Sequence, residues 1–566
     1  MFDALFTTTT EYKKLSHALS GKGACALFGL PASGRAQVYA ALCRQLDKPL
    51  CIVTPGEAEA TRFAADLNTL GIPAAVFPAR DYVLRSIEGT AREYEYRRLA
   101  VLGELVGGRL RAVAVPAEAL TQFTTPKEDF CANTRTLHAG DTLLRDDLLA
   151  ALFGAGYTRR AQVDGPGQFS VRGDIVDIFA PDQKMPVRME FWGDEIDTLH
   201  TFDLTTQRRE DAIDKFYLSP AREVLFGKPA DAAEQLRAFL AKQRGKKKTA
   251  MADCMAADLD LLDGGAVPVN MDKYLAVRYP HPATVLDYFD DPILVAEEPA
   301  SIREADRATV YRRGEELKSL ILDGVLCAGL DNLYADPSYL WSKTGHYRTI
   351  CAENFARSMP DQPLKDIINA PAHTLPAWNG EVAGLLEDLK PLCDAGYTVT
   401  LLAGTDRAAA GLARDLRDKG ILVTTDAAAA PAAGLVQVLA GHLSAGCEFP
   451  FAKYALLTGR AFGETSSQKK KRKKAKDALN SLTEITPGDL VVHQNHGIGR
   501  YAGIQRMAVQ GVTKDYLRIE YDKKDVLYVP VTQLDLLSRY TAPGDEEKVK
   551  LAKLGGAEWQ RTRAKV

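Results

Sequence analysis

The sequence predicts a multidomain α/β protein: a parallel-sheet unit with an antiparallel α+β insert, a second α/β unit and a small C-terminal β-barrel. Three observations predict it. Short apolar runs alternate with helical-period stretches near the N-terminus, alternating strand patterns begin near Pro126, and a β-dense segment follows Pro487. With 566 residues, 46% of them hydrophobic, the chain has material for about three to five domains with their own cores.

The N-terminal unit contains four short apolar segments of strand type, at residues 24–31, 49–55, 74–79 and 111–116. Helical-period stretches such as 35–46 and 57–70 lie between them. This alternation predicts a parallel sheet with crossover helices. Helical periodicity resumes near residue 230, and the apolar segment 293–298 predicts that the chain then returns to this sheet.

The three later regions have their own patterns. Residues 168–172, 174–179 and 187–192 alternate as strands and predict the antiparallel insert. The middle unit is expected to contain helices at 381–395 and 408–419 and strands at 398–403 and 421–424. In the C-terminal part, strands are expected at 489–493, 499–504, 516–521 and 526–530. About 60 residues of this kind predict a strongly bent barrel of Tudor or SH3 type.

These patterns divide the chain into seven segments. They are the first lobe (1–124), the insert (125–220), the return to the lobe (221–345), the middle α/β domain (346–460), a basic linker (461–485), the barrel (486–545) and a helical tail (546–566). The linker carries seven basic residues between positions 469 and 476. Such a run is typical of a solvated, flexible segment, with phosphate binding as the less favoured alternative.

Charge and cysteine content limit the classes of protein to which this chain can belong. The formal net charge of −3 excludes a field over the whole chain that would attract nucleic acid. The nine cysteines are odd in number and form no C-x-x-C pair, which indicates reduced thiols and a cytoplasmic location. We expect no signal peptide and no membrane span, because neither end of the chain nor its interior carries a sufficiently long apolar run.

The segment from Gly29 to Ala36 resembles a phosphate-binding loop. A loop that works with ATP reads G-x-x-x-x-G-K-[ST], where lysine neutralises the phosphates and the hydroxyl holds magnesium. Gly29 and Gly34 occupy the glycine positions, but Arg35 replaces the lysine and Ala36 the hydroxyl residue. We therefore expect no ATP hydrolysis here and interpret the segment as an ancestral loop kept as a tight turn. Weak anion binding at the helix N-terminus is the remaining alternative.

Two further motifs receive a structural interpretation. Glu297 and Glu298 end a predicted strand where an active ATPase places its magnesium-binding and water-orienting acids, and without a competent loop we interpret them as a relic. His493 and His496 form an H-x-x-H pattern. Two histidines without a third ligand nearby in the sequence are more often hydrogen-bonded loop residues, so we predict no metal.

Residues 488–501 (GDLVVHQNHGIGRY), followed by 514–517 (KDYL) and 527–531 (LYVPV), closely resemble the RNA-polymerase-interacting domain of bacterial transcription-repair-coupling factors. Residues 169–179 (FSVRGDIVDIF) and 188–197 (RMEFWGDEID) resemble the UvrB-like module of the same family. Residues 553–559 (KLGGAEW) are similar to the segment that leads into the family's motor.

The resemblance implies a degenerate RecA-like lobe whose insert docks UvrA through Arg172, Arg188 and Trp192; close relatives carry phenylalanine at the last position. It implies a barrel that pairs an edge strand with the RNA polymerase β subunit, for which Ile504, Arg506 and Met507 are our candidates. The tyrosine-rich hairpin with which UvrB clamps damaged DNA is not expected, because residues 81–84 pass quickly into the next helix.

The resemblance further implies that this chain corresponds to the N-terminal portion of such a factor and acts by binding, with no catalytic residue and no cofactor of its own. ATP, Mg²⁺ and most contact with double-stranded DNA are expected to belong to a translocase motor outside this sequence. Two alternatives stay open. One is an excision-repair helicase subunit of UvrB type, against which Arg35 and Ala36 count; the other is a stand-alone polymerase-binding transcription regulator.

Overall fold

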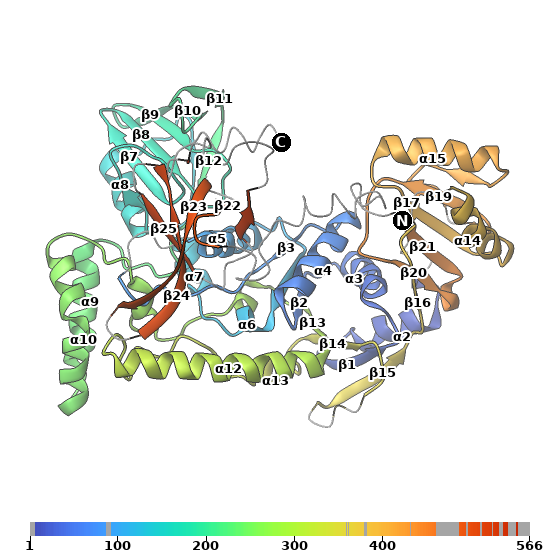
Figure 1. Ribbon diagram of the computed structural model, residues 1–566, viewed down its shortest axis with the longest axis horizontal. Helices are drawn as coiled ribbons and strands as arrows, with labels where there is room; N and C mark the ends of the chain where they lie inside the picture. Colours follow the sequence, from blue (N-terminus) through green and yellow to red (C-terminus); the bar gives the residue numbers. More distant parts are fainter. Residues whose placement is uncertain are drawn as a thin grey trace.

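The structure is a computed structural model that describes residues 6–86, 92–357, 359, 362–378, 382–430, 432–459, 486–493, 496–509, 512–522, 525–530, 536–540 and 551–552. The predicted basic linker lies outside these residues, as does the helical tail apart from residues 551 and 552. Figure 1 shows a long first unit, the middle domain at one end of it, and the C-terminal strands away from the middle domain.

The first unit is built on a seven-stranded sheet whose strand order is β15-β1-β14-β13-β2-β4-β3, with every neighbouring pair parallel. The strands are β1 (Gly23–Phe28), β2 (Leu50–Thr54), β3 (Ala74–Val76), β4 (Ala112–Pro116), β13 (Ile293–Glu297), β14 (Arg348–Glu353) and β15 (Leu364–Asn369). The five predicted strands are confirmed. The boundary expected at residue 346 is wrong, because β14 and β15 belong to this sheet.

Helices cover both faces of this sheet because its central strands are apolar on both sides. They are α2 (Thr10–Ala18), α3 (Ala32–Leu46), α4 (Glu57–Thr69), α5 (Glu93–Val106), α6 (Ala117–Leu120), α12 (Pro299–Leu322) and α13 (Tyr339–Lys343). A separate apolar cluster joins α9 (Pro229–Ala241) and α10 (Gly245–Asp263) to the far end of α12. Short turns η1 (Met271–Tyr274), α11 (Leu275–Arg278) and η2 (Val285–Tyr288) connect α10 to β13.

The insert is a six-stranded sheet of order β11-β10-β9-β8-β7-β6, antiparallel except for the short β6 and β7 pair. Its strands are β6 (Thr158–Arg159), β7 (Gln168–Arg172), β8 (Ile175–Phe179), β9 (Val187–Trp192), β10 (Glu195–Phe202) and β11 (Arg209–Ala212). α7 (Lys127–Ala132) leads in, and the β5 (Arg135–His138) and β12 (Lys215–Leu218) pair closes the insert. One face packs on α8 (Arg145–Gly154), and the opposite face carries a small apolar cluster that includes Phe179 and Phe202.

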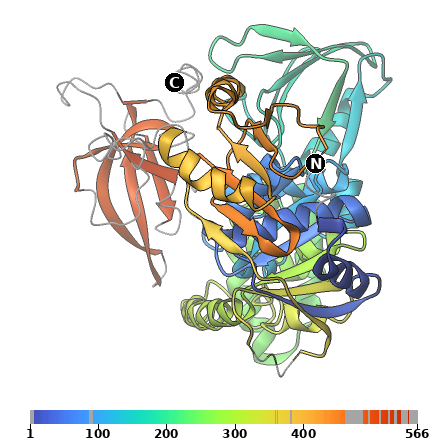
Figure 2. The ribbon, with the colours of Figure 1, turned by 90° about the vertical axis from the view of Figure 1, so that its right-hand side faces the viewer.

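The middle domain has a six-stranded mixed sheet of order β16-β20-β21-β17-β19-β18. Its elements are β16 (His373–Leu375), α14 (Val382–Asp394), β17 (Thr398–Leu402), α15 (Asp406–Asp418), β18 (Val423–Thr424), β19 (Val436–Leu439), β20 (Gly446–Phe449), η3 (Pro450–Ala452) and β21 (Tyr454–Thr458). α14 and α15 cover one face. The other face shares a core with α3, through residues such as Phe449 and Ala36, so this domain packs directly on the first unit (Figure 2).

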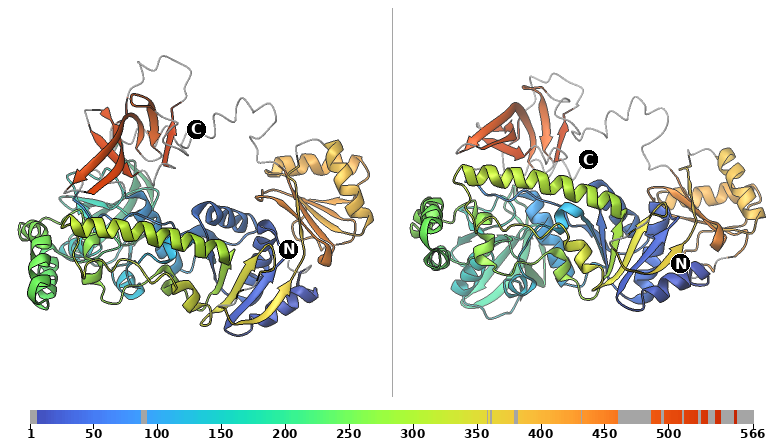
Figure 3. Two further views of the ribbon diagram at one scale, coloured as in Figure 1. Left: turned by 60° about the horizontal axis from the view of Figure 1, so that its bottom comes forward. Right: turned by 90° about the horizontal axis from the view of Figure 1, so that it is seen from below.

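The C-terminal strands form a five-stranded antiparallel sheet of order β25-β24-β23-β22-β26 around a small apolar core. They are β22 (Leu490–His493), β23 (Gly497–Val509), β24 (Val512–Glu520), β25 (Val526–Pro530) and β26 (Leu537–Arg539). Within the described residues no pairing joins β25 to β26, so closure into a barrel stays a prediction. This sheet and the middle domain occupy separate places on the first unit (Figure 3).

None of the helices described by the structure is both long and apolar enough to cross a lipid bilayer.

Candidate partner-binding surfaces and the phosphate-loop remnant

Gly29 makes the tight turn that follows β1. Its φ of +87° lies in the region that glycine adopts readily, and a Cβ atom there would lie 3.1 Å from the Ala370 carbonyl oxygen and 3.0 Å from Asn369 Oδ1. The chain then enters α3 at Ala32. The glycine is therefore required by the close approach of the segment after β15, whether or not a phosphate binds.

Arg35 is buried and directed at the two glutamates that end β13. Its Nε atom lies 3.0 Å from Glu297 Oε2, and its guanidinium donates a 2.9 Å hydrogen bond to Glu298 Oε1. Tyr39, one turn further along α3, donates a 2.5 Å hydrogen bond to Glu297 Oε1. Burial raises the pKa of Glu297 although Arg35 opposes it. The cation that would face phosphate in an active loop is thus engaged by the chain's own carboxylates.

The start of α3 is covered by the middle domain. A Cβ atom on Gly34 would lie only 2.9 Å from Cys447 Sγ and 3.4 Å from the ring of Phe449, both on β20. Ser33 and Phe449 are buried. β20 therefore packs directly against the first turn of α3.

The face of the insert opposite α8 carries a row of polar side chains. Asp177 on β8 lies in register with Arg188 on β9, and Ile175 pairs with Arg172 on one side and Glu190 on the other. Since side chains two apart on a strand share a face, Arg172, Arg188 and Trp192 all lie on this face. Trp192 is 82% exposed, which is unusual for a tryptophan.

Arg188 is a correction to the predicted surface set. Its side chain is buried, donates to both oxygens of Asp177 at 2.7 and 3.0 Å, and lies over the ring of Phe202. Asp177 is fully buried, and its Oδ2 also lies 2.5 Å from the guanidinium of Arg172. The Arg172 side chain is 46% exposed. Strand alternation places Arg188 on the expected face, but its guanidinium lies over Phe202 of β10 and donates to the carbonyl oxygen of Gln207, in the turn that follows β10. Arg188 therefore positions Asp177 and Arg172, while Arg172 and Trp192 are accessible to a partner.

The candidate polymerase-binding strand is paired on both sides for only part of its length. β22 pairs with β23 over residues 497–500, whereas Ile504 to Val509 pair with β24 alone among the described strands. Ile504 is 44% exposed. The backbones of Arg506 and Met507 lie on the same stretch, and their side chains lie outside the described residues. Whether this stretch contacts the polymerase stays a prediction.

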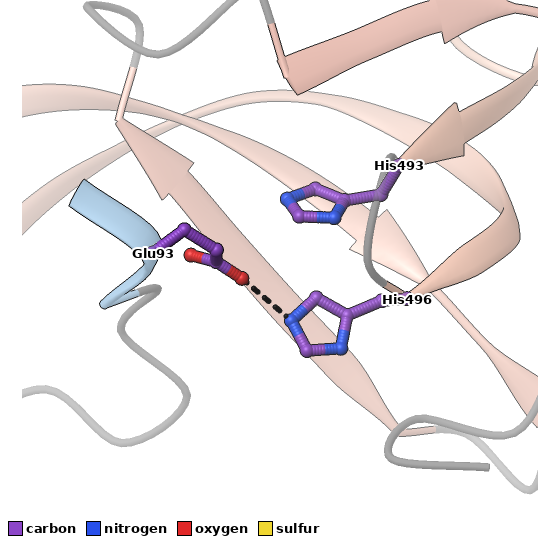
Figure 4. Close-up of side chains that lie close together, drawn as sticks. All are labelled: Glu93, His493 and His496. Carbon is purple, nitrogen blue, oxygen red and sulfur yellow. Dashed lines mark hydrogen bonds and ion pairs between the residues drawn. The ribbon is translucent and has the colours of Figure 1, made fainter. Parts of the chain in front are cut away.

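His493 and His496 meet a third side chain that the sequence does not place near them. Glu93, at the start of α5, accepts a 2.9 Å hydrogen bond from Nε2 of His496, and the two imidazole centroids are 4.7 Å apart (Figure 4). Burial lowers the pKa of His493 to about 4 despite the nearby carboxylate. Burial would raise the pKa of Glu93, but the hydrogen bond with His496 and the nearby His493 outweigh it and lower the pKa to about 2.

Tyr82 lies in the stretch where UvrB carries its clamping hairpin. It is buried, and its hydroxyl donates to the carbonyl oxygens of Phe123 and Leu333. This residue is therefore part of the core and not an exposed aromatic group available to DNA.

Comparison with known proteins matches two of these regions to described families. Residues 136–224 match the UvrB interaction domain, and residues 485–541 match the CarD-like/TRCF RID domain. A transcription-repair-coupling factor of Bacillus subtilis is 29% identical over 555 residues, and that of Staphylococcus haemolyticus is 28% identical over 556 residues. The chain is similar to the transcription-repair-coupling factors over nearly its whole length. The similarity covers 95% of this chain and 47% of each of these relatives, so the chain spans about half of their length.

Sequence reasoning missed three features of these surfaces. The first is Asp177, which holds Arg188 and Arg172. The second is the packing of Cys447 and Phe449 against the start of α3, and the third is Glu93 beside the two histidines. Only Asp177 had a usable signal, because strand alternation puts it on the same face as Arg172 and Arg188. The other two depend on contacts between segments hundreds of residues apart.

Proposed function

We propose that this chain is the partner-binding part of a factor for transcription-coupled nucleotide-excision repair, which recruits UvrA through its insert and binds RNA polymerase through its C-terminal sheet. The observation that carries the proposal is the presence of both matched modules on one chain, at residues 136–224 and 485–541. Each module lies on a different part of the first unit, so both surfaces can be used at once (Figure 3).

The UvrA surface is proposed to centre on Trp192 and Arg172. Tryptophan and arginine dominate binding energy at protein interfaces, because they combine a large contact area with directional hydrogen bonds. The exposed edge of Trp192 offers the apolar contact, and the half-exposed guanidinium of Arg172 is held in place by Asp177. A carboxylate-bearing partner surface fits this pair, since the guanidinium retains hydrogen-bond donors that Asp177 does not use.

The polymerase surface is proposed to be the outer side of β23 beyond Ile504, folded within a small barrel of Tudor or SH3 type. A strand with one unpaired side can accept a strand from a partner, so main-chain hydrogen bonds give affinity and neighbouring side chains give specificity. We assign this contact to the polymerase β subunit. Ile504 supplies an exposed apolar side chain at the start of this stretch.

The first lobe is proposed to serve as a docking platform without ATP turnover. Arg35 is occupied by Glu297 and Glu298, and β20 covers the start of α3. The resemblance implies that the family moves along double-stranded DNA with energy from ATP. We do not assign this activity to any residue of the first lobe.

A bridging assay tests the proposal with the whole chain. UvrA is immobilised, RNA polymerase core enzyme is added with or without the chain, and retained polymerase is measured. We expect polymerase to be retained only when the chain is present. The double variant Arg172→Ala with Trp192→Ala should lose UvrA retention and still bind polymerase in a direct assay. Retention of neither partner by the folded wild-type chain at micromolar concentration would overturn the proposal.

A further inference from the structure

The cluster of Glu93, His493 and His496 joins two parts of the chain that are about 400 residues apart in sequence. Glu93 begins α5 in the first lobe, whereas His493 ends β22 and His496 precedes β23 in the C-terminal sheet. One potential ligand atom from each residue lies within 4.8 Å of the others. Figure 4 shows the carboxylate and both imidazole rings gathered around one space.

The donor set suits a transition-metal ion. Two imidazole nitrogens and one carboxylate oxygen are the ligands of many three-residue Zn²⁺ sites, which keep a fourth position for water. A divalent cation held by two imidazole nitrogens and a carboxylate oxygen would offset the negative charge of the carboxylate. Glu93 Oε2 is itself buried and accepts no hydrogen bond from the described residues, which leaves a carboxylate oxygen available to a cation.

The spacing requires only small side-chain movements. With metal–nitrogen and metal–oxygen distances of about 2.0–2.2 Å, ligand atoms around a tetrahedral ion lie about 3.3 Å apart. His496 Nε2 and Glu93 Oε1 are already 2.9 Å apart. The ligand atoms all lie within 4.8 Å of one another, so the longest separation must shorten by at most about 1.5 Å, which rotation about side-chain bonds can supply. His493 is fully buried and the His496 side chain is 26% exposed, so an ion can enter from the His496 side.

We propose that Glu93, His493 and His496 bind a divalent transition-metal ion, with Zn²⁺ as the best fit, and that the ion clasps the C-terminal sheet to the first lobe. This goes beyond the coupling function and contradicts our expectation of no metal, which rested on the absence of a third ligand near the histidines in the sequence. Because the site has ligands from both parts, occupancy should hold the two parts together.

Metal binding is tested on the whole chain after removal of metals with a chelator. Zn²⁺ and Co²⁺ are titrated separately by calorimetry and absorption. We expect one equivalent bound, and Co²⁺ absorption bands in the visible range without the near-ultraviolet thiolate band that cysteine ligands produce. His496→Ala and His493→Ala should each weaken binding about tenfold or more. His281→Ala, which removes an exposed histidine elsewhere, is the matched control and should leave binding unchanged.

A second measurement keeps the proposal open to refutation if His493→Ala fails to fold. Glu93→Gln changes only the lobe side of the site, so the C-terminal sheet keeps its own residues. In the wild-type chain, Zn²⁺ should slow amide hydrogen exchange both at the start of α5 and in the segment between β22 and β23, and Glu93→Gln should abolish both effects. The proposal is overturned by an absence of stoichiometric uptake, by uptake that survives all three variants, or by protection of only one of the two segments.

Discussion

Arg35 and Glu297 form a buried ion pair, with Nε 3.0 Å from Oε2, in the place where a working phosphate loop and its acidic strand end would hold Mg²⁺ and ATP between them. The two side chains are each about 97% buried or more. The pair is an internal contact between α3 and β13, and it leads to predictions about stability as well as about activity.

Removal of Arg35 should destabilise the first lobe. Arg35→Ala leaves Glu297 buried without its cation, and breaking a buried ion pair from one side costs about 3–5 kcal/mol. The free energy of unfolding from urea titration measures the effect. Arg44→Ala on the exposed part of the same helix is the control, with an expected change within about 0.5 kcal/mol. If both variants lowered the free energy of unfolding equally, the ion pair of Arg35 with Glu297 would not stabilise the lobe more than an exposed arginine does.

Restoration of the loop consensus should not restore nucleotide binding. The double variant Arg35→Lys with Ala36→Thr supplies the lysine and hydroxyl, but Cys447 and Phe449 still cover the helix start. We expect no saturable binding of a fluorescent ATP analogue with Mg²⁺ at up to millimolar concentration. Binding by the folded double variant would show that β20 moves aside readily.

The two arginines of the insert should behave differently. Arg188→Ala removes two of the hydrogen bonds of the buried Asp177, so we expect a loss of about 1–3 kcal/mol in stability and weaker UvrA binding as a consequence. Arg172→Ala leaves those bonds intact and should cost less than about 1 kcal/mol, while weakening UvrA binding directly. Thermal unfolding and UvrA titration on the same samples separate the two. If Arg188→Ala kept full stability and lost binding, Arg188 would be a contact residue.

Ile504 should matter for polymerase binding and Arg500 should not. Ile504→Glu places a charge where β23 pairs with β24 alone among the described strands. We expect polymerase binding to weaken about tenfold or more, as on loss of a hot-spot side chain. Arg500 is exposed on the part of the same strand that β22 and β24 both pair with, so Arg500→Ala is the matched control. Surface plasmon resonance against polymerase core enzyme measures both. If both variants weakened polymerase binding equally, the part of β23 beyond Ile504 would not be the specific contact.

The buried charge network around Glu95 predicts a pH dependence of stability. Burial would raise the pKa of Glu95, but Arg80, Arg92 and Arg222 outweigh it and lower the pKa to about 2. A carboxylate with a lowered pKa in the folded state contributes stability that is complete above its unfolded value of about 4.3 and is lost as pH falls toward about 2. The difference in unfolding free energy between the wild-type chain and Glu95→Gln should be constant above about pH 5 and shrink below it. A constant difference down to pH 3.5 would contradict this assignment.

Local patterns predicted the secondary structure of the sheets well. The segments 168–172, 187–192 and 526–530 are strands with the predicted bounds, because a period of two in side-chain character is a property of the strand itself. β14 and β15 were not predicted, and the domain boundary was misplaced with them. β15 has mixed character, with exposed residues such as Ile367 beside the buried Ile368, because it lies at the edge of the sheet.

The sequence by itself determined the parallel unit, the antiparallel insert, the second α/β unit, the β-rich C-terminal part and the loss of the lysine and hydroxyl from the loop at Gly29 to Ala36. Tertiary structure alone decided that Arg35 is held by Glu297, that Arg188 supports Asp177 beneath the surface, and that Glu93 lies beside His493 and His496. The reason is physical. Side-chain periodicity specifies which face of an element is buried, whereas the partner of a buried charge depends on how distant elements dock, which no local pattern encodes.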